Sequence, residues 1–483
     1  MADHFPLLVP DARAAGTMEV TAPFDNAVIA TVEQADQSGV DKALKTANRL
    51  YRDRDTWLSP AMRIAILDRA IEIMRARRDE LAIEAAREGG KPLIDSEVEA
   101  DRAIDSVRIC VEELRTQRGT EIPMNVNAAS AGRLAFTQLE PRGVVVAFSA
   151  FNHPLNLIAH QVGPAVATGC PVIVKPAEAT PLSCWRFVEI LHEAGLPPEW
   201  CQALMTTDLD VTGQLVSDSR VGFFSFIGSA KVGWMLRSNL APGARCALEH
   251  GGAAPVIVAG DADLDDALPL LAKGGFYHAG QVCVSVQRVF AHRDVAHQVA
   301  EKLAELAYEM TVGDPTLPVT EVGPLIREGE VTRVGEWVEE AIDGGAEHLS
   351  GARELSSTTY APTVLFNPPT SAKVSTLEIF GPVIAVYPYD RFDEALGLAN
   401  SLPYAFQAAV FTRDLDTALR ASRYLDASAV MVNDHTAFRV DWMPFAGARE
   451  SGLGTGGIPY TMRDMQLEKM TIVRSAELGY PGG

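Results

Sequence analysis

The sequence has no long apolar segment, since no uninterrupted apolar run approaches the ~20 residues that a membrane-spanning helix needs. Residues 1–10 also lack the basic start and apolar core of a secretory signal peptide. Six cysteines are scattered along the chain, without a CxxC pair or a His/Cys cluster at zinc spacing. These absences predict a soluble cytoplasmic protein with reduced thiols and no metal site.

Positive charge is scarce beside negative charge: 42 Lys and Arg face 63 Asp and Glu, a net charge of −21. Such a chain is repelled by nucleic acid and by anionic membranes, so neither is expected as a partner. A cationic site for a small substrate remains compatible with this balance. The length of 483 residues predicts about two to four domains.

What the sequence does contain is an α/β rhythm. Short apolar runs such as Val144–Phe148, Pro171–Val174 and Gly222–Phe226 alternate with helical segments. This alternation is typical of a parallel, doubly wound sheet with helices on both faces. It begins again after Gly252, with strands expected at Pro255–Ala259 and Val284–Ala291 among others.

The predicted fold class is therefore α/β, with two doubly wound α/β domains and a small β arm. Residues 1–117 and 142–251 are expected to form the first domain, and residues 252–463 the second. The arm would combine 118–141 with 464–483, because the apolar tail Leu467–Val473 could pair with the ribbon that precedes residue 142.

Cys283 lies between an apolar helix expected at about 263–278 and the β-branched run Val284–Val289. The polar neighbour Gln281 and the small residues before it indicate a junction where a ligand could reach the thiol. Oriented backbone amides at such junctions can lower a thiol pKa. The alternative is a buried cysteine at a tight turn.

Two polar residues at the ends of predicted strands could assist a nucleophile. Asn152 follows Val144–Phe148 and could donate to a developing oxyanion, or else cap the next helix. Glu249 precedes a glycine pair and could act as a general base if burial raised its pKa. The alternative for Glu249 is an exposed charge before a turn.

Other residues suit a nucleotide. Lys175 and Glu178 follow a buried strand and could hold a ribose, or form a surface ion pair. Gly228 and Ser229 open a helix whose N-terminus favours a phosphate. A Gly-x-Gly-x-x-Gly fingerprint also occurs at 452–457, but no predicted strand precedes it, so we interpret it as a flexible loop.

Glu378 begins another predicted strand. Its carboxylate could accept a hydrogen bond from the second ribose of a dinucleotide, with Phe380 beside the nicotinamide. The alternative is an acid and a core phenylalanine at a strand start.

Together these segments resemble the aldehyde dehydrogenase superfamily over nearly the whole chain. The resemblance rests on seven motifs in order: Phe-Asn-His-Pro-Leu, Val-Lys-Pro-Ala-Glu, Ile-Gly-Ser, Glu-x-Gly-Gly, Gly-Gln-x-Cys, Glu-Ile-Phe-Gly-Pro and Pro-Phe-x-Gly. It implies a cofactor domain, a catalytic domain and an oligomerisation arm. It also implies NAD(P)+-dependent oxidation of a small-molecule aldehyde to the acid by a homodimer or homotetramer.

The resemblance further implies residue roles. Cys283 would attack the aldehyde, Asn152 would bind the oxyanion, and Glu249 would activate water against the thioester, with Lys175 also in the catalytic set. NAD is expected over NADP, because Glu178 would repel a 2′-phosphate. The expected cofactor contacts are Ala150, Phe151, Lys175, Ala177, Glu178, Gly228, Ser229, Glu378 and Phe380.

The substrate is expected to be a small carboxylated or hydroxylated aldehyde. The stretch 432–445 resembles lactaldehyde and phosphonoacetaldehyde dehydrogenases, with Arg439 and His153 as candidate substrate contacts. Val282 stands where those relatives tend to have Arg, and this loss weakens the case for a phosphonate. The alternative for Arg439 is a structural ion pair with an acidic neighbour, Asp434 or Asp441.

Other functions stay open from the residues alone. A CoA-acylating semialdehyde dehydrogenase would share the fold but generally lacks a base such as Glu249. A non-catalytic ligand-binding protein would not need the thiol, the amide and the carboxylate. A thiol hydrolase could pair Cys283 with His153 and would have no use for nicotinamide.

Overall fold

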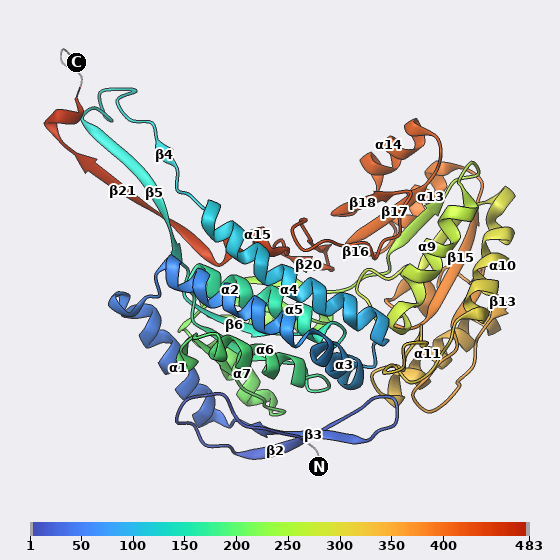
Figure 1. The fold of residues 1–483 in the computed structure, drawn as a ribbon. Coiled ribbons are helices and arrows are strands. Elements are labelled where there is room, and N and C mark those ends of the chain that lie inside the picture. The colour runs from blue at the N-terminus through green and yellow to red at the C-terminus, as the bar shows by residue number, and fades with distance from the viewer. Residues whose placement is uncertain (1–2, 480–483) are drawn as a thin grey trace.

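The computed structural model describes residues 3–479, which form two lobes and a projecting two-stranded ribbon (Figure 1). Each lobe is built on one large sheet, of six and seven strands respectively. None of the helices within residues 3–479 combines the length and the apolar character that crossing a membrane demands.

The six-stranded sheet has the spatial order β20–β10–β9–β6–β7–β8, and only its β20–β10 pair is antiparallel. Alternate residues of β6 enter different cores: Val145 and Ala147 face one helical layer, and Val144 and Val146 face the other. The strands are β6 (Val144–Phe148), β7 (Val172–Lys175), β8 (Cys201–Ala203), β9 (Val221–Ile227), β10 (Arg245–Glu249) and β20 (Gly452–Leu453).

Helices cover both faces of this sheet, as the fully apolar strands require. On one face α2 to α6 pack together, and on the other lie α1, α7 and α8. The bounds are α1 (Gln37–Arg52), α2 (Pro60–Ala76), α3 (Arg78–Gly89), α4 (Leu93–Thr116), α5 (Pro154–Thr168), α6 (Leu182–Glu193), α7 (Leu209–Ser217) and α8 (Ala230–Ser238).

The seven-stranded sheet has the order β13–β14–β15–β12–β11–β17–β18, and only β13–β14 is antiparallel. Its strands are β11 (Pro255–Val258), β12 (Arg288–His292), β13 (Glu347–Ser350), β14 (Thr363–Phe366), β15 (Val383–Tyr389), β17 (Gln407–Phe411) and β18 (Ala429–Val432). Its helices are α9 (Leu264–Phe276), α10 (Arg293–Glu309), α11 (Glu328–Asp343), α12 (Lys373–Thr376), α13 (Phe392–Ala399) and α14 (Leu415–Tyr424).

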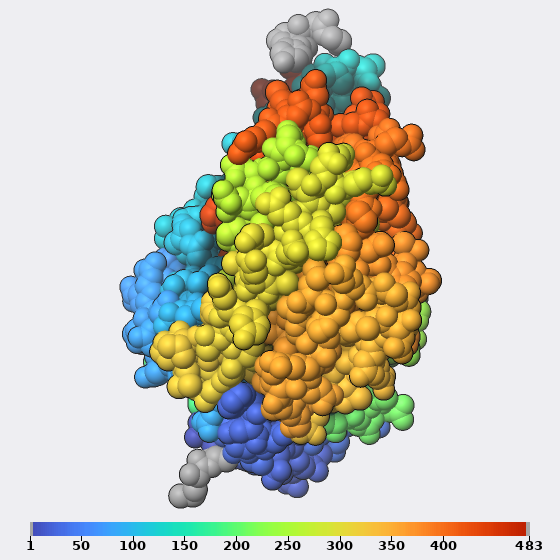
Figure 2. Space-filling model, turned by 90° about the vertical axis from the view of Figure 1, so that its right-hand side faces the viewer, coloured from blue at the N-terminus to red at the C-terminus, as the bar shows by residue number. Residues whose placement is uncertain are grey.

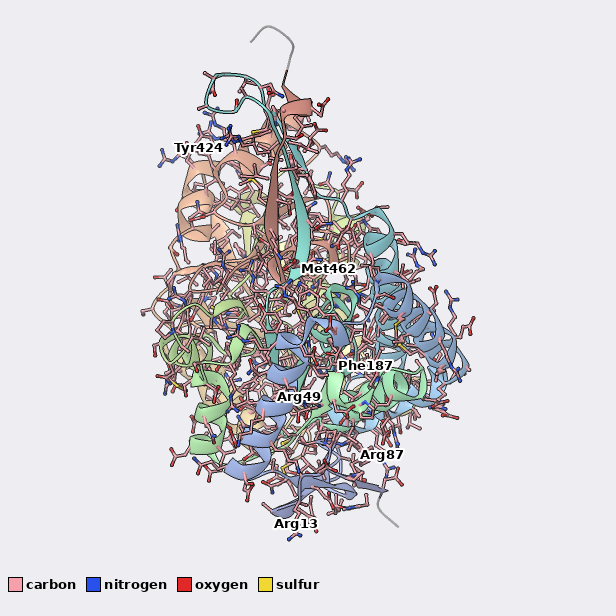
Figure 3. All side chains as sticks on the ribbon, turned by 90° about the vertical axis from the view of Figure 1, so that its left-hand side faces the viewer. Arg13, Arg49, Arg87, Phe187, Tyr424 and Met462 are labelled. Carbon is pink, nitrogen blue, oxygen red and sulfur yellow. The ribbon has the colours of Figure 1, made fainter. Side chains whose placement is uncertain are left out.

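The ribbon joins β5 (Arg133–Pro141) to β21 (Gln466–Arg474) in an antiparallel register that runs from Gln466 opposite Pro141 to Arg474 opposite Arg133. The short β4 (Glu121–Ile122) adds to its edge. Figure 3 shows the two long strands rising from the body of the protein, with Met462 of α15 (Ile458–Asp464) near the base. The predicted pairing of the tail with this ribbon is confirmed.

Smaller sheets complete the molecule. The N-terminal sheet is formed by β1 (Asp3–Phe5), β3 (Val28–Gln34) and β2 (Gly16–Thr21), and β16 (Tyr404–Ala405) pairs with β19 (Ala448–Arg449). Figure 2 shows dark blue N-terminal segments beneath the yellow and orange surface of the seven-stranded lobe. Asn26 and Glu328 form a hydrogen bond of 3.1 Å between these regions.

The α/β fold class with two large sheets and a β arm is confirmed, while the proposed domain boundaries stay a prediction. Two local predictions were wrong. The strand expected at Val284–Ala291 begins only at Arg288, because Val284 packs with Val282 and Phe445 in a small apolar cluster beside the site. The segment 452–457 is not a free loop, since β20 extends the sheet beside β10.

Candidate active site

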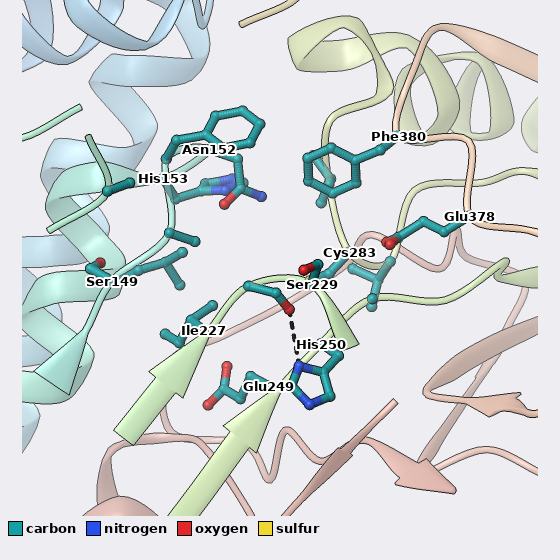
Figure 4. A pocket seen from close by; sticks show the side chains of 18 of the residues that line it. Ser149, Asn152, His153, Ile227, Ser229, Glu249, His250, Cys283, Glu378 and Phe380 are labelled. Carbon is teal, nitrogen blue, oxygen red and sulfur yellow. Dashed lines mark hydrogen bonds between the residues drawn. The ribbon is translucent and has the colours of Figure 1, made fainter. Parts of the chain in front are cut away.

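A cavity of about 530 Å³ lies where loops from both large sheets meet. Figure 4 shows Asn152 and His153 entering from one side, Glu378 and Phe380 from the other, and Cys283 between them. Of the predicted site residues, only Lys175 and Glu178 are absent from its lining. Those that line it are Ala150, Phe151, Asn152, His153, Ala177, Gly228, Ser229, Glu249, Val282, Cys283, Glu378, Phe380 and Arg439.

A left-handed turn presents Cys283 to the cavity. After α9, His278 and Ala279 adopt positive φ angles of 50° and 52°, a conformation that costs non-glycine residues about 1–3 kcal/mol. The buried Gln281 side chain fixes the turn: its Nε2 donates to the carbonyl of Pro324 over 3.1 Å, and its Oε1 accepts from the N–H of Ile326 over 2.9 Å. The chain therefore holds a strained loop in one conformation beside the thiol.

The Asn152 side chain points at the same loop. Its amide Nδ2 donates to the carbonyl of Gln281 over 2.9 Å, and the side chain is buried. The helix-cap alternative is wrong, because Glu99 of α4 caps α5 instead, accepting from the N–H groups of Leu155 and Asn156 over 2.9 Å each. An amide nitrogen carries two protons, so Asn152 keeps one donor for a ligand.

The cavity environment opposes ionisation of the thiol. Burial raises the pKa of Cys283 to about 12, with Glu378 and Glu249 also raising it and Arg439 lowering it. The backbone N–H at this turn does lower the thiol pKa, as the junction predicts, but its effect is smaller than that of burial. Desolvation and two nearby carboxylates outweigh the oriented amides of the turn.

Glu249 ends β10 and lines the cavity, so the alternative of a charge exposed before a turn was wrong. Burial raises the pKa of its carboxyl group, and the positive charge of Arg439 acts in the opposite direction. The carboxylate lies against Gly456, where a Cβ atom would collide with Oε1. A side chain at position 456 would force this carboxylate out of place.

Glu378 and Phe380 approach the cavity from the second sheet. The Glu378 carboxylate packs on Gly251, where a Cβ would collide with it, and accepts from the N–H of Gly252 over 3.2 Å. Burial raises the Glu378 pKa to about 8. Phe380 has a positive φ of 48° and meets Phe151 edge to face, with ring centroids 5.7 Å apart.

The remaining predicted cofactor residues lie along the end of the six-stranded sheet. Ser229 is the N-cap of α8 without a capping hydrogen bond from its side chain, so that hydroxyl is open to a ligand. The Lys175 ammonium lies 3.9 Å from Glu178, as the ion-pair alternative anticipated, and 5.7 Å from the centre of the Phe148 ring. Gly228, the N-terminus of α8 and the Glu378 carboxylate, all at the same cavity, fit a nicotinamide dinucleotide.

At the opposite end of the cavity lie two arginines, of which one forms an ion pair and the other does not. Arg102 of α4, which the sequence analysis did not single out, forms a bidentate pair with Asp441 at 2.7 and 3.1 Å. Arg439 forms no ion pair within residues 3–479, and its Nε has no hydrogen-bond partner there. The predicted alternative of an Arg439 ion pair with Asp441 or Asp434 was therefore wrong.

The Arg439 guanidinium packs against an aromatic ring on one face and contacts a histidine at its edge. Its central carbon lies 3.5 Å from the centre of the Phe445 ring, and its Nη2 lies 3.3 Å from Nδ1 of His160. Burial lowers the Arg439 pKa, and Glu249 raises it. The charge facing the cavity at this end is therefore the charge of Arg439.

Sequence reasoning missed several lining residues, among them Arg102, Asn156 and Tyr277. Arg102 and Asn156 lie inside helices, and nothing in their spacing distinguishes them from surface or core positions. Tyr277 follows α9 directly, and its proximity to the thiol loop was the one available signal.

Comparison with known proteins gives the class. A family model described as the aldehyde dehydrogenase family matches residues 10–471, and the chain belongs to this family. It is 36% identical over 457 residues to 3-sulfolactaldehyde dehydrogenase from Priestia aryabhattai, covering 94% of each chain.

Two solved structures are similar over nearly their whole length. One is aldehyde dehydrogenase 21 from Physcomitrella patens in complex with the reaction product succinate, with a TM-score of 0.94, 32% identity and 99% of each chain covered. Another is glyceraldehyde-3-phosphate dehydrogenase from Methanocaldococcus jannaschii with NADP, with a TM-score of 0.91, 32% identity, and 96% of this chain and all of that one covered. The chain is thus an enzyme that oxidises an aldehyde to the acid with NAD(P)+, which sets aside the thiol-hydrolase and non-catalytic alternatives.

Proposed function

We propose that the enzyme oxidises a small aldehyde carrying a second, anionic group, and that Arg439 binds this group. The observation that carries the proposal is the unpaired Arg439 guanidinium, which faces the cavity that Cys283 also lines. Arg439 is half-buried, and although Glu249 acts on its charge, no acid forms an ion pair with it within residues 3–479. A partly desolvated guanidinium of this kind is stabilised when a ligand supplies the opposite charge. The second guanidinium is already neutralised, because Asp441 binds Arg102.

In this proposal the Cys283 thiol gives its proton to solvent water as its sulfur attacks the carbonyl carbon. The C–S bond forms, the C=O π bond breaks, and the carbonyl oxygen becomes an oxyanion. The free N–H of Asn152 and the backbone N–H of Cys283 donate to that oxygen. Ser229, Glu378 and Phe380 would hold a nicotinamide dinucleotide, which would supply the hydride acceptor. Loss of the hydride from the carbon leaves an acyl group on the Cys283 sulfur. Glu249 takes a proton from water, the hydroxide adds to the thioester, and the acid leaves as the thiolate is released.

The three relatives named above support an anionic substrate. Sulfolactaldehyde carries a sulfonate, succinate carries a second carboxylate, and glyceraldehyde 3-phosphate carries a phosphate. The small cavity of this chain offers one unpaired cation at the end beyond the thiol, which suits one such group. Val282 leaves the position before the nucleophile uncharged. The site therefore offers the substrate one arginine, which favours an anion bound by a single guanidinium over a phosphonate bound by two.

For the cofactor we propose NAD+ in preference to NADP+. The Glu178 side chain, 54% exposed, lies at the carboxyl end of β7 beside Lys175. A carboxylate there accepts from a free 2′-hydroxyl and repels a 2′-phosphate.

For assembly we propose that the ribbon binds a second copy of the chain. Apolar side chains on both long strands are exposed, and a two-stranded ribbon is marginally stable by itself. The exposed residues are Leu134, Leu467, Met470, Ile472 and Val473. The double variant Met470→Lys/Ile472→Lys should have a smaller molar mass in solution than the wild type, as measured by light scattering. An unchanged molar mass would exclude this interface.

The test of substrate class compares succinic semialdehyde with butanal, which have the same number of carbons and differ in the terminal carboxylate. Arg439→Gln should lower kcat/KM for the charged aldehyde by about 100-fold, because a charge-assisted pair is lost, and change kcat/KM for butanal by less than about threefold. Arg333→Gln is the matched control: Arg333 also lines the cavity, but it is paired with Glu330. Equal losses for both aldehydes in Arg439→Gln would contradict the proposal.

A further inference from the structure

Behind the cavity wall, a chain of hydrogen bonds leads to the Arg439 guanidinium. His160 lies in α5, is buried, and is absent from the cavity lining. Its Nε2 is 2.7 Å from Oδ1 of Asp441, and its Nδ1 is 3.3 Å from Nη2 of Arg439. The imidazole therefore bridges a carboxylate and a guanidinium that do not pair with one another.

The protonation of the imidazole follows from its two neighbours. Burial alone would raise the pKa of Asp441, but hydrogen bonds from His160 and Arg102 lower it well below its usual range. A carboxylate only accepts hydrogen bonds, so Nε2 of His160 must carry the proton. Burial lowers the pKa of His160 to about 4, and the ring is neutral. Its Nδ1 then has a free lone pair, which can only accept from Arg439.

The remaining contacts of this cluster keep Asp441 in place. Arg102 donates to both of its carboxylate oxygens, and Asn156 Nδ2 donates to Oδ1 over 3.2 Å. Asn156 is itself held by Ser106, whose hydroxyl donates to Oδ1 of Asn156 over 3.1 Å. Asp441 is thus anchored by α4 and α5 together and offers His160 a fixed acceptor.

This arrangement orients the Arg439 guanidinium without neutralising its charge, which a direct ion pair could not do. A carboxylate touching Arg439 would hold the guanidinium but would also cancel its charge. A neutral imidazole acceptor orients one N–H edge and places no negative charge against the guanidinium. The face of Phe445 supports the guanidinium plane without supplying a formal charge either.

We infer that His160 and Asp441 are positioning residues that hold Arg439 toward the cavity and so set the preference for an anionic aldehyde. The inference rests on the proposed role of Arg439. The preference for an anionic aldehyde then depends on His160, which lines no part of the cavity. His160 acts through its Nδ1 acceptor, and Asp441 acts by fixing the tautomer and orientation of that ring.

The test measures the ratio of kcat/KM for succinic semialdehyde to kcat/KM for butanal at saturating NAD+. His160→Phe keeps the ring shape and removes both hydrogen bonds. Because a hydrogen bond to a charged group is worth enough for roughly a tenfold change, the ratio should fall about tenfold. The loss should lie in KM for the charged aldehyde, with kcat for butanal retained. A purely structural role would instead lower activity on both aldehydes alike.

His160→Leu is the second variant, for use whether or not His160→Phe folds. Leucine occupies part of the same apolar space and has no hydrogen-bonding group, so it removes both the donor toward Asp441 and the acceptor toward Arg439. It should show the same fall in ratio. Wild-type selectivity in a folded His160→Leu enzyme would overturn the inference.

A double-variant cycle separates this inference from the proposed function. In the Arg439→Gln background, His160→Phe should not lower the ratio further, because its only route to the substrate has been removed. A further fall of about tenfold in that background would overturn it. If Arg439→Gln shifts the ratio and His160→Phe does not, only the positioning role fails. If Arg439→Gln itself leaves the ratio unchanged, both the anion-binding proposal and the positioning role of His160 are wrong.

Discussion

Asn152 donates from its side-chain amide to the main-chain carbonyl of Gln281 over 2.9 Å, which ties the loop after β6 to the loop that presents Cys283. The two segments come from different sheets, so this hydrogen bond crosses between the two halves of the molecule. It fixes the donor and the nucleophile relative to one another before any substrate enters. Such preorganisation is what stabilisation of a developing oxyanion requires.

Asn152→Asp should therefore slow the chemical step. The variant preserves shape but replaces the donor with a charge that repels both the Gln281 carbonyl and an oxyanion. We expect kcat to fall by about 10²- to 10³-fold, in line with loss of one oxyanion donor. Steady-state absorbance of reduced nicotinamide measures the rate, and quenching of protein fluorescence checks that cofactor binding is kept. A kcat within about threefold of wild type would remove Asn152 from the mechanism.

The rate at which Cys283 is alkylated should rise with pH from about pH 7 to pH 9, without reaching a plateau. Burial raises the pKa of this thiol to about 12, so the reactive thiolate is a minor species at neutral pH. Its fraction, and the rate of inactivation by iodoacetamide, should increase about tenfold per pH unit between about pH 7 and pH 9. Peptide mass spectrometry separates this reaction from that of Cys246, the other partly exposed cysteine within residues 3–479. A plateau below pH 9 would show a much lower thiol pKa.

Glu378→Gln should stabilise the cofactor-free enzyme at alkaline pH. Burial raises the pKa of Glu378 from 4.5 to about 8, so the folded state retains a proton that the unfolded state gives up. The unfolded state then binds fewer protons, and stability is lost as pH rises from 4.5 through 8. Glutamine keeps the acceptor for Gly252 and cannot ionise. The difference in Tm between variant and wild type should increase from pH 6 to pH 8.5, and a constant difference would contradict the raised pKa.

Glu178→Gln should weaken discrimination between the two nicotinamide cofactors. Removing the carboxylate removes its repulsion of a 2′-phosphate while leaving a group that can hydrogen-bond. We expect kcat/KM with NADP+ to rise by about tenfold and with NAD+ to fall by a smaller factor. Glu199→Gln, on the same lobe but away from the cavity lining, is the control. Comparable use of both cofactors by the wild type would contradict the proposed preference.

Much of the site could be predicted because parallel sheets place the carboxyl ends of their strands at one edge. Asn152 and Glu249 each end or follow a strand, so their convergence follows from the alternation of apolar runs. The family motifs then supplied Cys283 from the second sheet. The strand predicted at Val284–Ala291 began too early, because β-branched residues suit a strand and a packed cavity wall equally well.

The remaining features depend on contacts between distant segments. Glu99 caps α5 from within α4, and Arg102 reaches the cavity from the middle of the same helix, with no local pattern to mark either. The raised pKa of Cys283 comes from burial by both lobes. The bridge from Asp441 through His160 to Arg439 joins residues separated by about half the chain, and only the packed structure reveals it.

The most direct test of the account is to trap the acyl enzyme. Glu249→Gln should still transfer hydride but hydrolyse the thioester slowly, giving a burst of about one reduced nicotinamide per site followed by a slow rate. After an acid quench, peptide mass spectrometry should find the acyl group of the aldehyde on Cys283, and added CoA should not restore the wild-type rate. A Glu249→Gln enzyme with no burst and no adduct on Cys283, or with an adduct elsewhere, would contradict covalent catalysis by this thiol.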